Sequence, residues 1–300
     1  MLDILAIHWN VDPVIFSIGP ISLRWYSLLF VSGFIYGCYI LRWFMRKEGV
    51  NEALVDPYLY AMLICVIIGA RLGHCLFYDT AYYFGSWKGF LEVFQPWKGG
   101  LASHGGAIGI ILGLLWFSRK YGKQEGFDFW WIADRTVMIV AFAGACIRLG
   151  NLFNSEIYGY HTNLPWGIIF ERTGDPLPKH PTMLYEALAY LIMGIVMNWI
   201  YRKKLDKMYR GEFFGIFLTF CFGVRGLLEF TKAPSVILFT IGDVVINMGH
   251  ALSLPFCLAG IAIWIWSVKR GVPARAFREP TTPTKTPKKS EPTHYAKPLK

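Results

Sequence analysis

A single histidine, His104, stands among glycines at the start of an apolar stretch. Gly105 and Gly106 directly follow it, and glycines let backbone N–H groups approach a ligand closely. Where such a stretch begins a helix, its N-terminal end favours anions. A histidine there can accept a proton near neutral pH, so His104 is a candidate general base. No H-x-x-x-H motif or carboxylate stands at ligand spacing, so we expect no metal.

A second polar group begins at Arg148 and continues through Asn151 and Asn154 to Glu156. On a helix Arg148 and Asn151 would share a face, although Gly150 could end that helix. Arginine binds phosphate oxygens through a planar fork of donors, and lipid phosphates lie where an apolar span meets water. The alternative is a helix-end cap with an interfacial arginine.

A third group pairs Arg225 with Glu229 at a spacing of four residues, which places both on one helix face. A glutamate beside an arginine fixes the direction of the guanidinium and leaves other donors free for a second anion. The alternative is a charge pair that only holds two helices together.

Long apolar stretches must position these groups. The chain has 300 residues, of which 54% are hydrophobic and 17% aromatic. They gather in runs near the ~20 residues that a helix needs to cross hydrocarbon. We predict an all-α, polytopic membrane helix bundle with about seven transmembrane helices. They lie roughly at 21–41, 55–77, 105–118, 129–147, 183–201, 212–230 and 248–268.

Basic residues give the orientation of these spans. The net charge is +10, and most Lys and Arg residues follow the first, third, fifth and seventh spans. Positive loops stay in the cytoplasm, so the N-terminus is expected outside and the C-terminus inside. We read the basic excess as this topology signal and expect no nucleic-acid partner. Residues 1–270 form the membrane domain, 150–181 a small outer cap, and 271–300 a disordered basic cytoplasmic tail.

Most charges at membrane depth then fall on the outer side. Tyr26, Arg71, His104, Arg148, Arg225 and Glu229 all lie there, whereas Asp134 and Arg135 lie on the inner side. For these last two we expect a structural or snorkelling role. Buried charges are costly and commonly functional, so the outer group predicts an enzyme that processes phospholipid at the outer leaflet.

Several motifs resemble one family, the prolipoprotein diacylglyceryl transferases of the bacterial inner membrane. The resemblance covers about residues 8–270 in order. It rests on Asp12-Pro13 with Arg24-Trp25-Tyr26, His104-Gly105-Gly106, the segment from Arg148 to Gly159, His180-Pro181-Thr182-Met183-Leu184-Tyr185-Glu186, and Arg225-x-x-x-Glu229. Two departures are Ile147, where the family usually has Gly, and Leu152, where Phe is usual.

The resemblance implies transfer of the diacylglyceryl group from phosphatidylglycerol to the lipobox cysteine thiol of a prolipoprotein, at the periplasmic side. A thioether forms, glycerol phosphate leaves, and no cofactor is needed. It implies catalytic roles for His104, Arg225 and Glu229. Substrate-binding roles fall to Arg148, Asn151, Asn154, Glu156, Tyr26, Gly105 and Gly106. Whether His104 acts as a base or positions a substrate is left open.

The main alternative is a lipid flippase or transporter. It would use the same buried charges but needs a path across the whole bilayer, and the chain has no internal repeat of the kind common in transporters. An intramembrane protease is disfavoured, because no G-x-S-x-G serine or pair of aspartates occurs within the spans.

Overall fold

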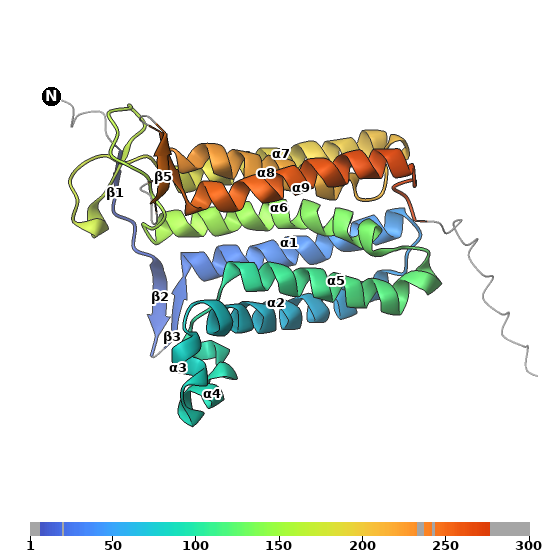
Figure 1. Cartoon of the computed structure of the whole chain (residues 1–300), viewed down its shortest axis with the longest axis horizontal. Coiled ribbons are helices and arrows are strands. Elements are labelled where there is room, and N and C mark those ends of the chain that lie inside the picture. The colour runs from blue at the N-terminus through green and yellow to red at the C-terminus, as the bar shows by residue number, and fades with distance from the viewer. Residues whose placement is uncertain (1–6, 20, 233–236, 242–243, 277–300) are drawn as a thin grey trace, which may run out of the picture.

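Long helices running side by side make up most of the structure, a computed structural model that describes residues 7–19, 21–232, 237–241 and 244–276 (Figure 1). They are α1 (Trp25–Lys47), α2 (Val55–Phe77), α5 (Ser103–Glu125), α6 (Phe129–Phe153), α7 (Thr182–Lys204), α8 (Glu212–Glu229) and α9 (Met248–Arg270). Each predicted span overlaps one of these helices, and α2 has the predicted bounds.

Five of the described helical segments are long and apolar enough to cross a membrane. They are α1, α2 with the short 3-10 helix η1 (Glu52–Leu54), α6, α7 with η4 (Leu205–Lys207), and α9. Of the two other long helices, α5 has polar ends that lower its mean hydropathy, whereas α8 is strongly apolar but carries three charged residues, Glu212, Arg225 and Glu229. The described part of the chain is therefore a mostly helical bundle of a kind compatible with a membrane.

Short elements gather at one end of the bundle, which we call the strand end (Figure 1). The strands β1 (Ile7–Trp9) and β4 (Ile168–Phe170) pair in parallel, whereas β2 (Val14–Ile18) with β3 (Ile21–Arg24) and β5 (Ile237–Ile241) with β6 (Val244–Asn247) pair antiparallel. The short helices α3 (Thr80–Phe84) and α4 (Trp87–Val93) project sideways, and η2 (Pro96–Lys98) and η3 (Glu171–Thr173) lie in connections. The all-α prediction was wrong in this respect, because strands of three to five residues carry little sequence periodicity.

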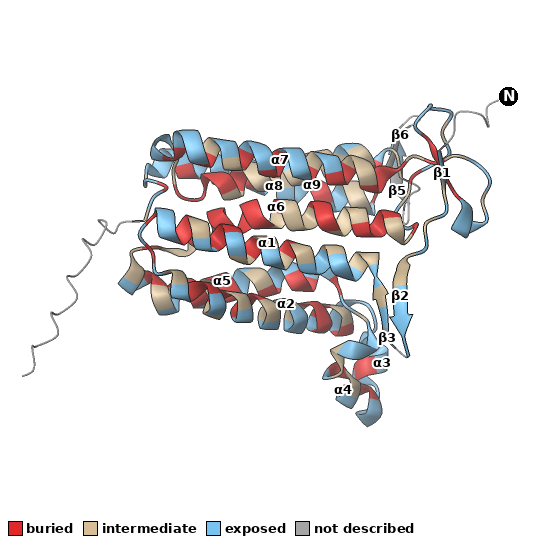
Figure 2. Ribbon diagram, turned by 180° about the vertical axis from the view of Figure 1, so that it is seen from behind, coloured by how far each residue is buried: buried red, intermediate tan, exposed pale blue. Residues whose placement is uncertain are grey.

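Helix α6 lies at the centre of the bundle (Figure 2). Other parts of the protein bury 56% of the apolar stretch of α6 but only 17% of that of α9, whose side chains largely face outward. Helix α1 packs on α6 at Gly33 and Gly37, where a Cβ would meet Ala143 or Ile139. Helix α2 packs on α5 and helix α8 on α9, and a seam runs between the α2–α5 pair and the α1–α6 pair.

The end opposite the strands, which we call the basic end, is held by buried charges. Asp134 accepts hydrogen bonds from the backbone N–H groups of Gly211 and Phe214, at 2.8 and 2.9 Å, and so caps α8 from a neighbouring helix. Arg135 donates to Glu48 at 2.6 Å, and both side chains are almost wholly buried. These residues have the structural role that was expected, but their burial excludes snorkelling.

Glu48 is the centre of this network. It also accepts hydrogen bonds from Trp131, Tyr201 and the backbone of Ala276. Burial alone would raise the pKa of Glu48, but Arg135 and these donors hold that pKa below its usual value. The carboxylate therefore stays charged and ties several helices together.

The first residues after α9 are part of the folded bundle. Ala274 is buried, and its carbonyl accepts from Arg135 at 2.9 Å. The carbonyls of Pro273 and Arg275 accept from Arg210. Residues 271–276 thus correct the domain boundary at 270, because backbone hydrogen bonds to buried arginines hold them. The remainder of the expected disordered tail, 277–300, lies outside the described residues.

The connection between α6 and α7 lies at the strand end and contains β4 and η3. Since α6 continues to Phe153, this connection begins later than the cap expected at 150–181. Asp175 accepts from His161 at 2.8 Å and from the Leu177 backbone at 3.0 Å, and it pairs with Lys179 at 2.9 Å. These contacts hold the pKa of Asp175 well below its usual range, so its charge keeps the loop together at neutral pH.

Candidate active site

A polar cluster forms where α6 ends. Arg148 donates from Nη1 to Oδ1 of Asn151 at 3.1 Å, and Asn151 donates to Glu156 at 2.7 Å. Asn154 donates to the same Glu156 oxygen at 3.1 Å. The structure therefore brings these four predicted residues together. The backbone reverses just beyond the helix, where Ser155 has a φ of 54°.

Gly150, which could have ended α6, does not do so. The helix continues through it to Phe153, and Gly150 instead makes room for Tyr26 of α1. A Cβ on Gly150 would lie 2.7 Å from Cδ2 of that ring. Arg148 and Glu156 are within electrostatic reach of the Tyr26 phenol. Tyr26 thus lies beside the cluster on the neighbouring helix, and its role in substrate binding remains a prediction.

Two further charges complete the cluster from α7 and from the end of α8. Glu186 is fully buried and forms an ion pair with Nε of Arg148. Its other oxygen accepts from Nζ of Lys232 at 2.5 Å. Lys232 in turn lies 3.7 Å from Glu229. The result is a chain of alternating charges in the order Arg148, Glu186, Lys232 and Glu229.

Arg225 lies half-buried on α8 and belongs to the same neighbourhood. Tyr190 of α7 and Cys221 of α8 are both within electrostatic reach of Arg225, Arg148 and Glu186. Among residues 7–19, 21–232, 237–241 and 244–276, Arg225 makes no ion pair and no hydrogen bond. As far as these residues are concerned, its guanidinium donors are available for an anion.

Glu229 does not pair with Arg225 within that part of the chain, although their spacing places them on one helix face. Its carboxylate lies against Gly249 in the first turn of α9, so close that a Cβ on Gly249 could not fit. A negative charge is favoured beside a helix N-terminus, which carries partial positive charge. Lys232 and this helix end, rather than Arg225, accordingly balance Glu229.

The cluster is built to hold an anion. Nε and Nη1 of Arg148 are fixed by Glu186 and Asn151, while Nη2 has no hydrogen bond among the described residues. With Arg225 within electrostatic reach of the same Tyr190 and Cys221 side chains, two guanidinium groups share one neighbourhood of the helix bundle. Fixed arginine donors of this kind suit the oxygens of a phosphate group.

Comparisons with known proteins give the family. The family model for prolipoprotein diacylglyceryl transferase matches residues 13–266. A phosphatidylglycerol–prolipoprotein diacylglyceryl transferase of Tolumonas auensis is 39% identical over 88% of this chain and 98% of its own length. Enzymes of the same name from Bacteroides fragilis and Chloroherpeton thalassium are 39% and 38% identical over 86% and 88% of this chain, and 94% and 95% of their own lengths. The chain belongs to the prolipoprotein diacylglyceryl transferase family.

In this family member, the candidate base His104 opens α5 at the strand end. Its side chain is exposed. Within the described part of the chain, no hydrogen bond or ion pair joins His104 to another residue. The structure therefore does not bring His104 into contact with Arg148 or Arg225, and a role in transfer remains a prediction.

The two glycines after His104 differ in their surroundings. Gly105 packs against α2, where a Cβ would lie 2.1 Å from the carbonyl oxygen of Gly69. Gly109 continues the same close contact with Cys65. A Cβ on Gly106, by contrast, would meet only ordinary contacts, the nearest being Ala70 at 3.7 Å. Close helix packing, in which small residues let backbones approach, accounts for Gly105.

Arg71, another charge of the predicted outer group, has a structural role. Its guanidinium is buried and donates to the backbone carbonyls of Glu92, Val93, Gly99 and Gly100, at 2.5 to 3.2 Å. It therefore holds together the segment that leads from α4 into α5.

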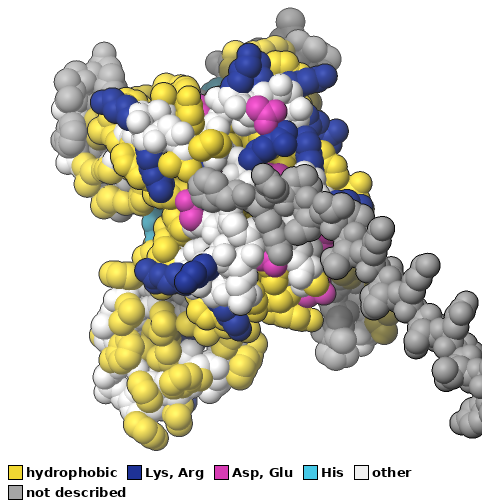
Figure 3. Space-filling model, turned by 90° about the vertical axis from the view of Figure 1, so that its right-hand side faces the viewer, with side chains coloured by type: hydrophobic (Ala, Val, Ile, Leu, Met, Phe, Trp, Pro, Cys, Tyr) yellow, Lys and Arg dark blue, Asp and Glu magenta, His cyan; other side chains and the backbone are white. Residues whose placement is uncertain are grey.

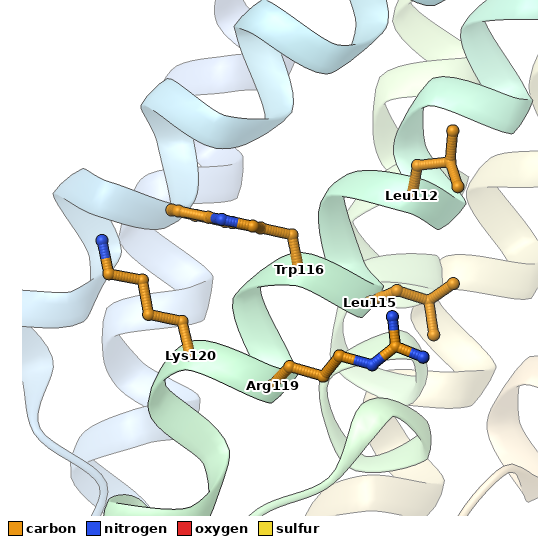
Figure 4. A pocket seen from close by; sticks show the side chains of 5 residues that line it. All are labelled: Leu112, Leu115, Trp116, Arg119 and Lys120. Atoms are coloured by element: carbon orange, nitrogen blue, oxygen red, sulfur yellow. The ribbon is translucent and has the colours of Figure 1, made fainter.

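The pocket in Figure 4 is also separate from the cluster. It is a shallow hollow on α5 lined by Leu112, Leu115, Trp116, Arg119 and Lys120. These residues lie in the middle and second half of α5, which ends at the basic end, whereas Arg148 lies in the last turns of α6, which ends at the strand end. The hollow holds basic and apolar side chains only, as expected where a helix leaves a membrane.

Sequence reasoning missed Glu186 and Lys232. Glu186 ends the motif that begins at His180, but no role was assigned to it, although a carboxylate within an apolar helix is by itself a signal of function. Lys232 follows α8 and has no such signal, because a lysine just beyond a span is common. Its importance comes only from contact with Glu186, which lies 46 positions away in the chain.

Proposed function

We propose that this protein transfers the diacylglyceryl group of phosphatidylglycerol to the lipobox cysteine thiol of a prolipoprotein. Its relatives carry these two substrates in their names. The observation that carries the proposal is the arginine pair, with Arg148 fixed by Glu186 and Asn151 and Arg225 half-buried nearby. These two arginines would bind the phosphate of the lipid headgroup.

The proposed reaction is a displacement at the terminal carbon of the diacylglyceryl group. The thiolate sulfur attacks that carbon, the carbon–sulfur bond forms and the carbon–oxygen bond to phosphate breaks. The electron pair remains on the phosphate oxygen, and glycerol phosphate leaves. Arg148 and Arg225 would stabilise the negative charge on this leaving group, as preorganised donors do at low dielectric.

The surrounding residues would serve this step in distinct ways. Asn151, Asn154 and Glu156 hold one another and so shape the headgroup site. Glu229 balances Lys232, and both would keep the outer charge network fixed. Tyr26 would hydrogen-bond either substrate.

His104 would accept or direct the thiol proton. It opens α5 with its side chain exposed, so a peptide could approach the imidazole there, and the buried Gly106 would contribute through its backbone. Because a free thiol has a pKa of ~8.5, a weak base suffices. Gly105 would contribute through its backbone alone, since its Cβ position faces α2.

Basic residues support an orientation with the strand end outside. Helices α1, α5, α7 and α9 carry Lys or Arg in their last turns, and all four end at the basic end. Figure 3 shows Lys and Arg side chains on this end of the molecule. The positive-inside rule then places the basic end in the cytoplasm and the cluster at the periplasmic face.

Tryptophans at the same end support this orientation. Lys47 lies over Trp43, Lys120 over Trp116, Lys204 over Trp199 and Arg270 over Trp266, at 4.8 to 5.5 Å from the ring centres. Tryptophans and basic residues favour the membrane–water interface. We therefore propose seven spans in the bacterial inner membrane, a periplasmic N-terminus and cap, and a cytoplasmic C-terminal tail.

The test uses purified protein, phosphatidylglycerol and a peptide containing a lipobox cysteine. We expect a diacylglyceryl thioether on the cysteine, detected by mass spectrometry, together with free glycerol phosphate. A folded preparation that makes no thioether but moves lipid across vesicles would instead support a flippase.

A further inference from the structure

An apolar cavity of about 250 Å³ lies in the seam between the α1–α6 and α2–α5 helix pairs of the bundle. Its walls come from α1, α2, α5 and α6, and include Phe34, Val66, Ile110 and Val140. It contains no charged side chain. The residues proposed for the transfer reaction do not line this cavity.

The cavity begins close to the charge cluster. Phe30 of α1 and Ile147 of α6 line its upper part, and Ile147 directly precedes Arg148. Tyr26 lies one helical turn above Phe30 on the same face of α1. A lipid whose phosphate contacts Arg148 can therefore extend a chain past Tyr26 into the seam.

Tyr58 and Thr136 line the inner end of the cavity, and we call this pair its floor. The Tyr58 hydroxyl and the Thr136 hydroxyl are hydrogen-bonded at 2.9 Å, and Tyr58 is buried. Phe117 packs edge-on against the Tyr58 ring from behind, with ring centres 5.5 Å apart. Both hydroxyls are satisfied, since Thr136 also donates to the carbonyl of Ile132.

The length of the cavity matches one membrane leaflet. Thr136 and Ile147 are eleven residues apart on α6, which at 1.5 Å per residue corresponds to about 16 Å. Half of a ~30 Å hydrocarbon core is about 15 Å. A chain anchored at Arg148 would thus reach the Tyr58–Thr136 floor when it is as long as a leaflet is deep.

We propose that this cavity takes one acyl chain of the donor phospholipid, and that the Tyr58–Thr136 floor limits the chain length accepted. The inference rests on the proposed function. Lipid tails and apolar side chains are equally hydrophobic, so the cavity selects by fit rather than by a gain in hydrophobic burial. Close packing then makes a chain that is too long as unfavourable as an overfilled core.

Filling the cavity tests this assignment. Val140 lies seven residues below Ile147 on α6, which is about 10 Å deeper in the cavity. An octanoyl chain is half as long as a chain that spans a leaflet, so it reaches only about 8 Å. For Val140→Trp we expect transfer from dihexadecanoyl phosphatidylglycerol to fall about tenfold or more because the ring occupies the lower cavity. Transfer from the dioctanoyl lipid should stay within about twofold of wild type.

Val196→Trp is the matched control, because Val196 is exposed on α7 and does not line the cavity. It should leave transfer from both lipids unchanged. A Val140→Trp protein that loses transfer from both lipids equally, or from neither, overturns the assignment. Wild-type protein that makes no product from either lipid would instead show failure of the proposed function.

Opening the floor gives an independent arm. Tyr58→Leu removes the phenol of this floor, so the rate with didocosanoyl relative to dihexadecanoyl phosphatidylglycerol should rise several-fold. This ratio is insensitive to the amount of folded protein. An unchanged ratio contradicts the proposed floor.

Discussion

Arg148 gains its direction from two neighbours on different helices. Glu186 holds Nε and Asn151 holds Nη1. The guanidinium is therefore fixed before an anion binds, and binding costs little further side-chain freedom. Glu186 is fully buried and also holds Lys232, which makes it a positioning residue for the cluster.

Replacing this carboxylate should therefore impair donor binding. For Glu186→Gln we expect kcat/KM for phosphatidylglycerol to fall roughly ten- to a hundredfold, the effect of losing charged hydrogen bonds worth about 1.5–3 kcal/mol. The fall should appear for the lipid and not in KM for the peptide. Glu171→Gln, at an exposed carboxylate, is the control and should leave both unchanged. Transfer at the wild-type rate by Glu186→Gln would remove its positioning role.

His104 calls for a different measurement, because it is exposed and contacts neither arginine. If it accepts the thiol proton, the wild-type rate falls toward acid pH as the base becomes protonated. His104→Gln should lower the rate and flatten that acid limb. His161→Gln, which removes another exposed histidine at the strand end, should keep the limb. A low rate with an unchanged profile would assign His104 to positioning.

Residue types and spacing predicted Arg148, Asn151, Asn154 and Glu156 as one group because they lie within nine positions of each other, whereas a role for Tyr26 came from the family resemblance. Residue spacing could not predict Lys232 or the separation of Arg225 from Glu229. Those contacts depend on how α7, α8 and α9 meet. Two charged residues spaced four apart lie on one helix face, but they need not form an ion pair when another partner is nearer, as Lys232 is to Glu229.

At the scale of elements, the glycines of α5 set the approach of α2. Gly105→Ala places a methyl group against the Gly69 carbonyl, with too little space for it. We expect a loss of about 1–3 kcal/mol in the free energy of unfolding in detergent, typical of overpacking. Gly106→Ala, one residue along, should change stability by no more than about 0.5 kcal/mol.

The rate of transfer per folded molecule distinguishes a role in helix packing from a role in which the glycine backbone contacts a substrate. If Gly106 only approaches a substrate through its backbone, Gly106→Ala should lower the rate while the melting temperature stays constant. Equal melting temperatures for Gly105→Ala and Gly106→Ala would contradict the packing account.

Long helices were predictable because apolar runs near the length of a membrane crossing dominate their sequences. The ends of these helices were less predictable, because α6 continues through Gly150 and α1 continues into Arg46 and Lys47. The strand pairs and the short helices α3 and α4 had too few residues for a periodic signal. Their positions follow from contacts such as those of Arg71.

At the scale of the whole molecule, Glu48 joins α1, α6 and α7 with the segment after α9. Glu48→Gln would leave Arg135 charged, buried and poorly paired, so we expect a loss of roughly 3–5 kcal/mol in the free energy of unfolding. Glu52→Gln, at an exposed pair with Arg46, should cost no more than about 1 kcal/mol. Thermal unfolding in detergent measures both. Similar melting temperatures would show that the basic end is not held by this network.

Charge distribution predicted an orientation for the bundle, since Lys and Arg follow alternate spans. It could not predict that Asp134 caps α8 or that residues 271–276 return to the core. Both depend on buried partners far away in the chain. The pairing of α2 with α5 and of α1 with α6, which leaves the apolar seam between them, likewise required the three-dimensional arrangement.

The central claim is that Arg148 binds the phosphate of the donor lipid. The most direct measurement is transfer by Arg148→Ala and Arg148→Lys, with phosphatidylglycerol and a lipobox peptide, in preparations with the helical content of wild type. We expect no detectable thioether with alanine and a rate lowered by about tenfold or more with lysine, which keeps the charge but lacks the fork of donors. Near-wild-type transfer by folded Arg148→Ala would contradict the account.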